Sequence, residues 1–295
     1  MRELHCNLIM DAVRQLWVEA NTVMPPDIRS ALERAMATEE SPLGRELLER
    51  TLAADQMAWT QGKPIAQDTG LAVVYLELGQ EVRLVGGDLG DAVNEGIRRG
   101  SREAGLYPVV VADPFGRSNT GDNTPAILHL TMVAGEGVRL WVVPAGYQEE
   151  KATALKVFRA YASREELTEF ILDAVRGLGA DPCPPLLVGV GLGGISQQAL
   201  DLSRRALLHP VGERNPDPAY ASWEEALMEE INALGIGPQS LGGTTTALAV
   251  HILSCPTHQY GAPCAVSLGG CTFRRAGKKR GFGKAVVVFL RLRFL

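Results

Sequence analysis

The sequence predicts an α/β or α+β protein, in which layers of mixed β-sheet are flanked by helices and preceded by a helical N-terminal lead-in. Amphipathic segments with apolar residues at helical spacing fill the first 60 residues. From residue 71 onward, short apolar runs typical of buried strands alternate with further helical segments. The chain has no repeat of fixed period and no linker-like stretch. One catalytic domain is therefore expected over residues 1–276, followed by a basic extension over residues 277–295.

The helical lead-in should contain three helices. The first, over residues 3–20, carries its apolar side chains on one face: Leu4, Leu8, Val13, Leu16 and Trp17. Asp27 follows two prolines and can cap a second helix over residues 28–36. Pro42 marks the start of a third helix over residues 43–59, because proline is favoured in the first helical turn.

The next part of the chain is expected to form a sheet, with one helix and one polar loop. Residues 71–78 are a continuous apolar run consistent with a buried strand. Residues 126–133 and 138–143 are strand-like and are separated by Gly135-Glu136-Gly137, which predicts a β-hairpin. The other expected elements are a helix over residues 89–104, a short strand over residues 109–111 and a loop over residues 117–125.

The second half opens with a clear helix start. Ser163 and Glu166 stand three residues apart before an amphipathic run, as in a capping box. This helix should end near Gly177. The later expected elements are a strand over residues 186–190 and helices over residues 196–208 and 223–234.

Composition and charge narrow the classes of protein and of partner. Of the 295 residues, 46% are hydrophobic and 21% charged, which is ordinary for a globular protein. No apolar run reaches the roughly 18 residues of a membrane span, and the N-terminus lacks the features of a secretory signal, so a cytoplasmic location without membrane contact is expected. Lys and Arg, but no Asp or Glu, follow Glu230. This basic segment is either a solvated tail or a surface for an anionic molecule, and its few aromatic residues disfavour nucleic acid.

Three kinds of residue could carry chemistry. The tripeptide Gln67-Asp68-Thr69 places an amide, a carboxylate and a hydroxyl between a helix and a strand, which is typical of a turn or of the edge of a site. Cys183 and Cys271 each stand beside proline or glycine, where a thiolate could approach a ligand, although a cysteine is also a common core residue. His258 lies in a polar loop and could act as an acid, a base or a ligand.

A glycine-rich segment at residues 189–194 follows a predicted strand and precedes a predicted helix. A phosphate-binding turn would have this placement. The dinucleotide-binding fingerprint is absent, however, and no acidic residue stands at the expected distance. Close packing of the backbone near a ligand or a cluster is therefore the favoured interpretation.

Taken together, these segments resemble the α subunit of the class I, iron–sulfur hydro-lyases, which are fumarate hydratase and L-tartrate dehydratase. Six short segments occur in the family's order. They are residues 64–70, residues 119–126, Cys183-Pro184-Pro185 with residues 189–194, residues 237–248, Pro256-Thr257-His258, and Cys271 with Arg274-Arg275.

The resemblance implies an enzyme, a hydro-lyase that adds or removes water on a C4 dicarboxylate (malate and fumarate, or tartrate and oxaloacetate). It implies a [4Fe–4S] cluster held by three cysteines, with an open iron that acts as a Lewis acid on the substrate. Cys183 and Cys271 match two of these metal ligands. Asp68 and His258 match catalytic residues, and Gln67, Asp68 and Thr69 match substrate-binding positions. The partners implied are a separate β subunit, a second α chain and the small dicarboxylate.

One position departs from the family pattern at the cluster itself. Ala66 stands where the family has its first cysteine ligand, and alanine has no atom that can bind iron. Cys6, Cys255 or Cys264 could in principle replace the missing thiolate. The alternative is a catalytically impaired paralogue or variant that keeps the fold and the binding of the β subunit but lacks a complete cluster.

Overall fold

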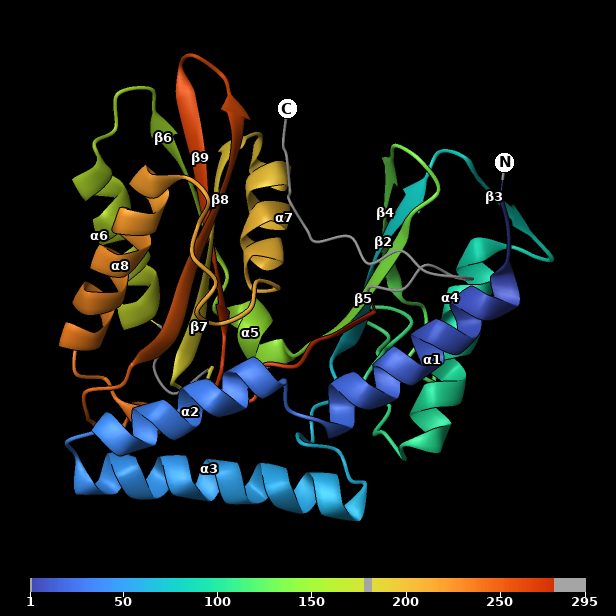
Figure 1. Ribbon diagram of the computed structural model, residues 1–295, viewed down its shortest axis with the longest axis horizontal. Coiled ribbons are helices and arrows are strands. Elements are labelled where there is room, and N and C mark those ends of the chain that lie inside the picture. The colour runs from blue at the N-terminus through green and yellow to red at the C-terminus, as the bar shows by residue number, and fades with distance from the viewer. Residues whose placement is uncertain (1, 178–181, 279–295) are drawn as a thin grey trace. The chain divides into compact units, whose positions relative to one another are not determined.

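The computed structural model describes residues 2–177 and 182–278 (Figure 1). The chain divides into two compact units. The first unit comprises Met1–Pro25, Asp55–Gly146 and Arg274–Leu295, and the second comprises Pro26–Ala54 and Tyr147–Phe273. Both units mix helices with sheet, which confirms the predicted fold class. Within the described ranges, no helix is long and apolar enough to cross a membrane. The predicted basic extension lies outside the described residues from residue 279 onward.

The first unit is built on a four-stranded sheet with the order β10-β5-β2-β4, together with a parallel pair of β1 and β3. Helices α1 and α4 pack against one another, and Trp17, Val74 and Ile97 belong to one core that includes residues of both helices and of the sheet. Gly96 permits the close approach of the helices, because a Cβ there would lie 2.7 Å from the carbonyl oxygen of Met10. The elements of this unit are β1 (Arg2–His5), α1 (Cys6–Thr22), β2 (Leu71–Gly79), β3 (Val82–Val85), α4 (Leu89–Glu103), β4 (Ile127–Val133), β5 (Val138–Ala145) and β10 (Ala276–Lys278).

The predicted hairpin between residues 126–133 and 138–143 is wrong. β4 and β5 both pair with β2, which lies between them, with β4 parallel to β2 and β5 antiparallel. The connection from β4 to β5 passes the end of β2, where Gly79 N–H donates to Gly137 O at 2.7 Å. All residues of β2 except Leu71 are buried. A strand buried in this way needs a pairing partner on each edge, because unpaired backbone groups are costly away from water.

The predicted strand over residues 109–111 is also wrong, because these residues form only an isolated bridge between Val111 and Asn119. They belong instead to a polar loop that connects α4 to β4. The loop closes on itself through Thr120 N–H, which donates to Val110 O at 2.9 Å. Its backbone is therefore ordered by pairing within the loop rather than by joining the sheet.

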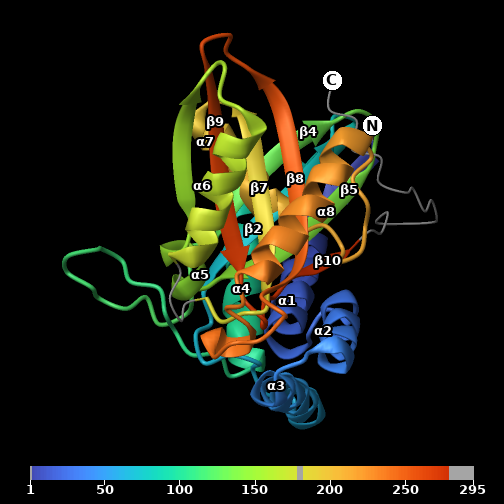
Figure 2. The same ribbon diagram turned by 90° about the vertical axis from the view of Figure 1, so that its left-hand side faces the viewer.

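The second unit contains a sheet with the order β6-β9-β7-β8. Helices α6 and α8 lie on one face of this sheet and α7 on the other (Figures 1 and 2). Ile171 of α6 and Leu227 of α8 share a core with Val188 of β7. The elements of this unit are α2 (Pro26–Thr38), the first part of α3 (Pro42–Gln61), α5 (Tyr147–Lys151), β6 (Ala154–Arg159), α6 (Arg164–Arg176), β7 (Leu186–Gly194), α7 (Ser196–Ala206), α8 (Pro218–Ala233), the short 3-10 helix η1 (Pro238–Ser240), β8 (Ala247–Thr257) and β9 (Gly261–Gly269).

The glycine-rich segment at residues 189–194 is part of strand β7, not a phosphate-binding turn. A Cβ at Gly189 would lie 2.1 Å from the carbonyl oxygen of Ser203, and one at Gly191 would lie 2.0 Å from that of Ala199. Both oxygens belong to helix α7. The glycines therefore allow this helix to pack directly on the strand, which confirms the predicted close packing of the backbone, whereas a ligand or cluster nearby stays a prediction.

The capping box at the start of α6 is confirmed. Glu166 N–H donates to Ser163 Oγ at 3.3 Å, and Ser163 N–H donates to Glu166 Oε2 at 2.9 Å. Two backbone donors that the helix itself cannot satisfy are thereby paired.

Candidate functional site

The turn that carries Gln67 and Asp68 lies in the first unit and is anchored on both sides. Before it, Ile65 N–H donates to the carbonyl oxygen of Asn21 at 2.8 Å. After it, Thr69 Oγ1 donates to the carbonyl oxygen of Tyr107 at 2.7 Å. Gln67 is exposed and Asp68 is partly exposed, whereas Thr69 is only 1% exposed. The turn thus presents an amide and a carboxylate, while the hydroxyl of Thr69 is directed to the protein backbone.

Glycine is required at the end of this turn. Gly70 has a φ of +73°, and a Cβ there would lie 2.7 Å from the backbone of Ala145. Gly70 N–H donates to Asp68 Oδ1 at 2.9 Å, which orients the carboxylate of Asp68 relative to the start of strand β2. The direction of the Asp68 side chain is therefore set by the local backbone.

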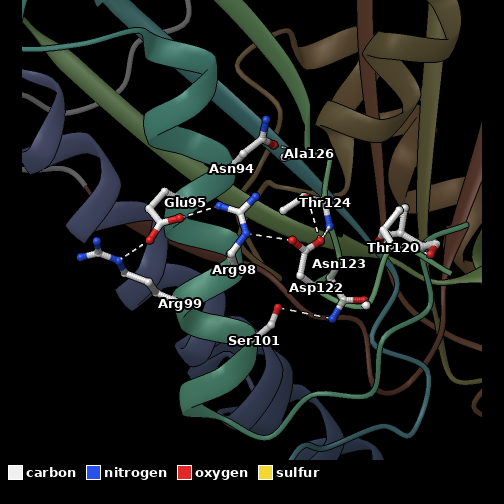
Figure 3. A network of polar contacts seen from close by, with 12 residues as sticks. Asn94, Glu95, Arg98, Arg99, Ser101, Thr120, Asp122, Asn123, Thr124 and Ala126 are labelled. Carbon is white, nitrogen blue, oxygen red and sulfur yellow. Dashed lines mark hydrogen bonds and ion pairs between the residues drawn. The ribbon is translucent and has the colours of Figure 1, made fainter. Parts of the chain in front are cut away.

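The polar loop at residues 117–125 is held against helix α4 by an ion pair between Arg98 and Asp122 (Figure 3). Arg98 Nε donates to Asp122 Oδ2 at 2.8 Å, and the same guanidinium contacts Glu95. Asp122 Oδ1 accepts hydrogen bonds from the backbone N–H of Thr124 at 3.0 Å and from its hydroxyl at 2.6 Å. Burial raises the pKa of Asp122, but Thr124 and Arg98 outweigh it and hold that pKa below its ordinary value. Asp122 thus acts as a fixed anion that shapes the loop.

Cys183 and Cys271 lie side by side in the second unit. Cys271 N–H donates to Cys183 O at 2.8 Å. The hydrogen bond between the two thiols and the burial of Cys271, which is 5% exposed, raise the pKa of the Cys271 thiol well above its ordinary value. Gln239 N–H, from the glycine-rich loop at residues 237–243, donates to Pro184 O at 3.0 Å. This loop therefore contacts the chain directly beside Cys183.

The structure does not bring a third cysteine to this pair within the second unit. Cys183 precedes β7, whereas Cys264 pairs with Leu192 near the other end of that strand. Between Leu187 and Leu192 the strand advances by about 17 Å. Cys255 lies at the same far end, where its sulfur would be 2.9 Å from a Cβ at Gly194. Neither Cys255 nor Cys264 is therefore placed to replace the missing thiolate.

Cys6 is equally unsuited to replace the thiolate at position 66. It begins helix α1, and its thiol donates to Gly87 O at 3.3 Å. Asn21, whose carbonyl holds the turn beside Ala66, is near the other end of the same helix, about 22 Å along its axis. No group of three or more His, Cys, Asp or Glu side chains in the described part of the chain could hold a metal ion. Among the described residues, two thiols therefore come together, and two thiols do not fit a cluster that needs three.

His258 lies in the turn between β8 and β9, where its Nδ1 accepts a hydrogen bond from Tyr260 N–H at 3.2 Å. Strand β9 runs from this turn towards Cys271 and spans about 26 Å. The second unit therefore places His258 and the cysteine pair at opposite ends of its sheet.

One buried carboxylate beside the glycine-rich loop at residues 237–243 was not identified from the sequence. Glu39, which is 0% exposed, accepts hydrogen bonds at 2.9 Å from the backbone N–H groups of Ser41, Thr244 and Thr245. Burial raises the pKa of Glu39, but these hydrogen bonds outweigh it and lower the pKa to about 2. The carboxylate fixes the end of the glycine-rich loop, and a Cβ at Gly243 would lie 2.8 Å from Glu39 Oε1. A single glutamate at a helix end carries no sequence signal for this role.

Comparison with known proteins gives the family. The family described as fumarate hydratase (fumerase) matches residues 10–279. "Putative L(+)-tartrate dehydratase subunit alpha" of Methanocaldococcus jannaschii is 33% identical to 92% of this chain, over 97% of its own length. L(+)-tartrate dehydratase subunit alpha of Escherichia coli strain UTI89 is 31% identical over 93% of this chain and 91% of its own. The chain therefore belongs to the fumarate hydratase family and is a homologue of hydro-lyase α subunits.

Proposed function

We propose that this chain is the α subunit of a hydro-lyase that adds or removes water on a C4 dicarboxylate, either malate and fumarate or tartrate and oxaloacetate. The observation that carries the proposal is the turn that presents Gln67 and Asp68, anchored on both sides in a chain that aligns with α subunits over nearly its whole length. A separate β subunit and a second α chain are the proposed protein partners, and the cytoplasm is the proposed location.

The side chains of the turn suit the two polar parts of such a substrate. The amide of Gln67 can donate a hydrogen bond to a substrate carboxylate, and the carboxylate of Asp68 can accept one from a substrate hydroxyl. Dehydration also requires a base to remove a proton from carbon, and His258 is proposed for this proton transfer because a ring nitrogen of imidazole can accept a proton. Cys183 and Cys271 are proposed as the metal-binding residues, and a [4Fe–4S] cluster on this chain would need a substitute for the ligand missing at Ala66.

A second candidate is favoured by the residue at position 66. Ala66 has no donor atom, and only two thiols come together among the described residues, one fewer than the family's cluster needs for its affinity. The second candidate is a catalytically impaired member of the family that keeps the fold and binds the β subunit. In this case the turn and the cysteine pair persist without the chemistry.

Anaerobic iron–sulfur reconstitution of three α chains, with and without the β subunit, separates the two candidates. The chains are the natural sequence, Ala66→Cys, and Cys183→Ser as the control that removes a thiol. About four irons and four sulfides per natural chain, with turnover of malate or tartrate, would support the hydro-lyase. Iron bound only by Ala66→Cys would support the impaired family member. Iron retained equally by Cys183→Ser would refute the assignment of the cysteine pair.

A further inference from the structure

Two polar segments of the first unit meet at one backbone carbonyl. The carbonyl oxygen of Tyr107 accepts a hydrogen bond from Thr69 Oγ1 at 2.7 Å and another from Asn123 Nδ2 at 3.3 Å. Thr69 ends the turn that presents Gln67 and Asp68, and Asn123 belongs to the loop at residues 117–125. Thr69 and Asn123 lie 54 positions apart in the sequence, yet both donate to the same acceptor.

Asn123 is itself held from several sides. It is 1% exposed and has a φ of +61°, a conformation that asparagine tolerates better than most residues. Its Oδ1 accepts a hydrogen bond from Val109 N–H at 2.8 Å, and its Nδ2 also contacts Ser101 Oγ at 3.3 Å. Figure 3 shows the side chains of Ser101 and Asn123 directed towards one another. Ser101 Oγ also accepts a hydrogen bond from Trp17 Nε1 at 2.9 Å.

These contacts form an unbroken polar connection from helix α1, through α4 and the loop, to the turn. The side chains of the connection are buried (Trp17, Ser101, Asn123 and Thr69), so losing one partner leaves another buried group without full hydrogen bonding. On its other side the turn is anchored by the hydrogen bond from Ile65 N–H to Asn21 O. Residues 66–68 lie between the two anchors, so releasing Thr69 frees one end of the segment that carries Gln67 and Asp68.

We propose that Thr69 and Asn123 are positioning residues, which couple the Gln67-Asp68 turn to the loop at residues 107–125 through the carbonyl of Tyr107. The inference rests on the proposed function in one respect, namely that Gln67 and Asp68 contact the substrate. It reassigns the buried hydroxyl of Thr69 from substrate binding to the support of its neighbours.

The first arm of the test measures the coupling without any activity. Thr69→Val removes the hydroxyl at nearly constant shape, Thr69→Ser keeps it, and Thr131→Val makes the same change on the exposed side of strand β4 in the same unit. Hydrogen–deuterium exchange of the whole α chain is followed by mass spectrometry. Thr69→Val should accelerate exchange about fivefold in peptides covering both residues 63–70 and residues 107–125. Thr69→Ser and Thr131→Val should leave both unchanged.

Acceleration confined to residues 63–70 would overturn the coupling, as would acceleration by Thr131→Val.

The second arm measures kcat and KM of the complex with the β subunit on malate and tartrate. Thr69→Val should lower kcat at least tenfold, with recovery in Thr69→Ser, because only the orientation of Gln67 and Asp68 has changed. Unchanged kcat in Thr69→Val would overturn the positioning role. If the natural complex shows no turnover, the proposed function fails while the exchange arm still decides the coupling.

Discussion

The buried carboxylate of Glu39 should contribute strongly to stability, and its contribution should depend on pH. The pKa of Glu39 is about 2 in the folded chain, against 4.5 for an ordinary glutamate. Because each pKa unit corresponds to about 1.4 kcal/mol, the ionised form stabilises the fold by about 3 kcal/mol near neutral pH. A folded pKa that is lowered gives stability that is present above about pH 4.5 and is lost as pH falls towards 2. At pH 3 about 1.5 kcal/mol of this contribution should remain.

Glu39→Gln tests this reasoning. The glutamine amide keeps the shape of the side chain, but its NH2 group would face backbone N–H groups that donate hydrogen bonds to the carboxylate in the natural chain. The variant should lose about 3 kcal/mol of unfolding free energy at pH 7, and the gap to the natural chain should narrow to about half at pH 3. Urea unfolding followed by circular dichroism at both pH values measures the gap. Glu40→Gln is the matched control, since Glu40 is exposed. A loss below about 1 kcal/mol at pH 7, or a gap that does not change with pH, would refute the reasoning.

Three further substitutions test packing and capping by their effect on the melting temperature in calorimetry. Gly70→Ala forces a side chain into a left-handed conformation against the backbone of Ala145 and should cost about 2 kcal/mol or more; an unchanged melting temperature would contradict this. Gly191→Ala should separate α7 from β7 and cost about 1–3 kcal/mol, whereas Gly137→Ala, with nothing within 4 Å of the added Cβ, should be nearly neutral. Ser163→Ala removes half of the capping box and should cost about 1 kcal/mol, and equal stability would show that the cap is dispensable.

Features of the fold that depend on nearby residues could be predicted from the sequence. The apolar run at residues 71–78 gave the central strand β2, and Ser163 with Glu166 gave the start of α6, because both signals lie within one element. The position of β2 between β4 and β5 could not be predicted in this way. Strand order depends on which edges must be covered, and the glycines at residues 135–137 fit a hairpin turn as well as a longer connection.

In the candidate site too, features that depend on nearby residues could be predicted from the sequence, and features that depend on distant residues could not. Cys183 and Cys271 were identified from local composition and family order, and the structure places them together although 87 residues lie between them in the sequence. Glu39 and Asn21 were not identified, because each acts on a segment far away in the sequence: Glu39 on Thr244 and Thr245, and Asn21 on Ile65. A residue whose partners are backbone N–H and C=O groups leaves no motif, since every residue type except proline supplies both groups.

The intact turn around Ala66 is no argument for an intact cluster. Its anchors are the backbone of Ile65, the hydroxyl of Thr69 and the conformation of Gly70, and none of them involves the side chain at position 66. A change from cysteine to alanine there would leave these contacts in place, so the fold can persist when the ligand is lost. By the same reasoning, Ala66→Cys should fold as well as the natural chain, since Ala66 is only partly buried. The iron content of that variant therefore reports on ligand chemistry alone, separately from the stability of the scaffold.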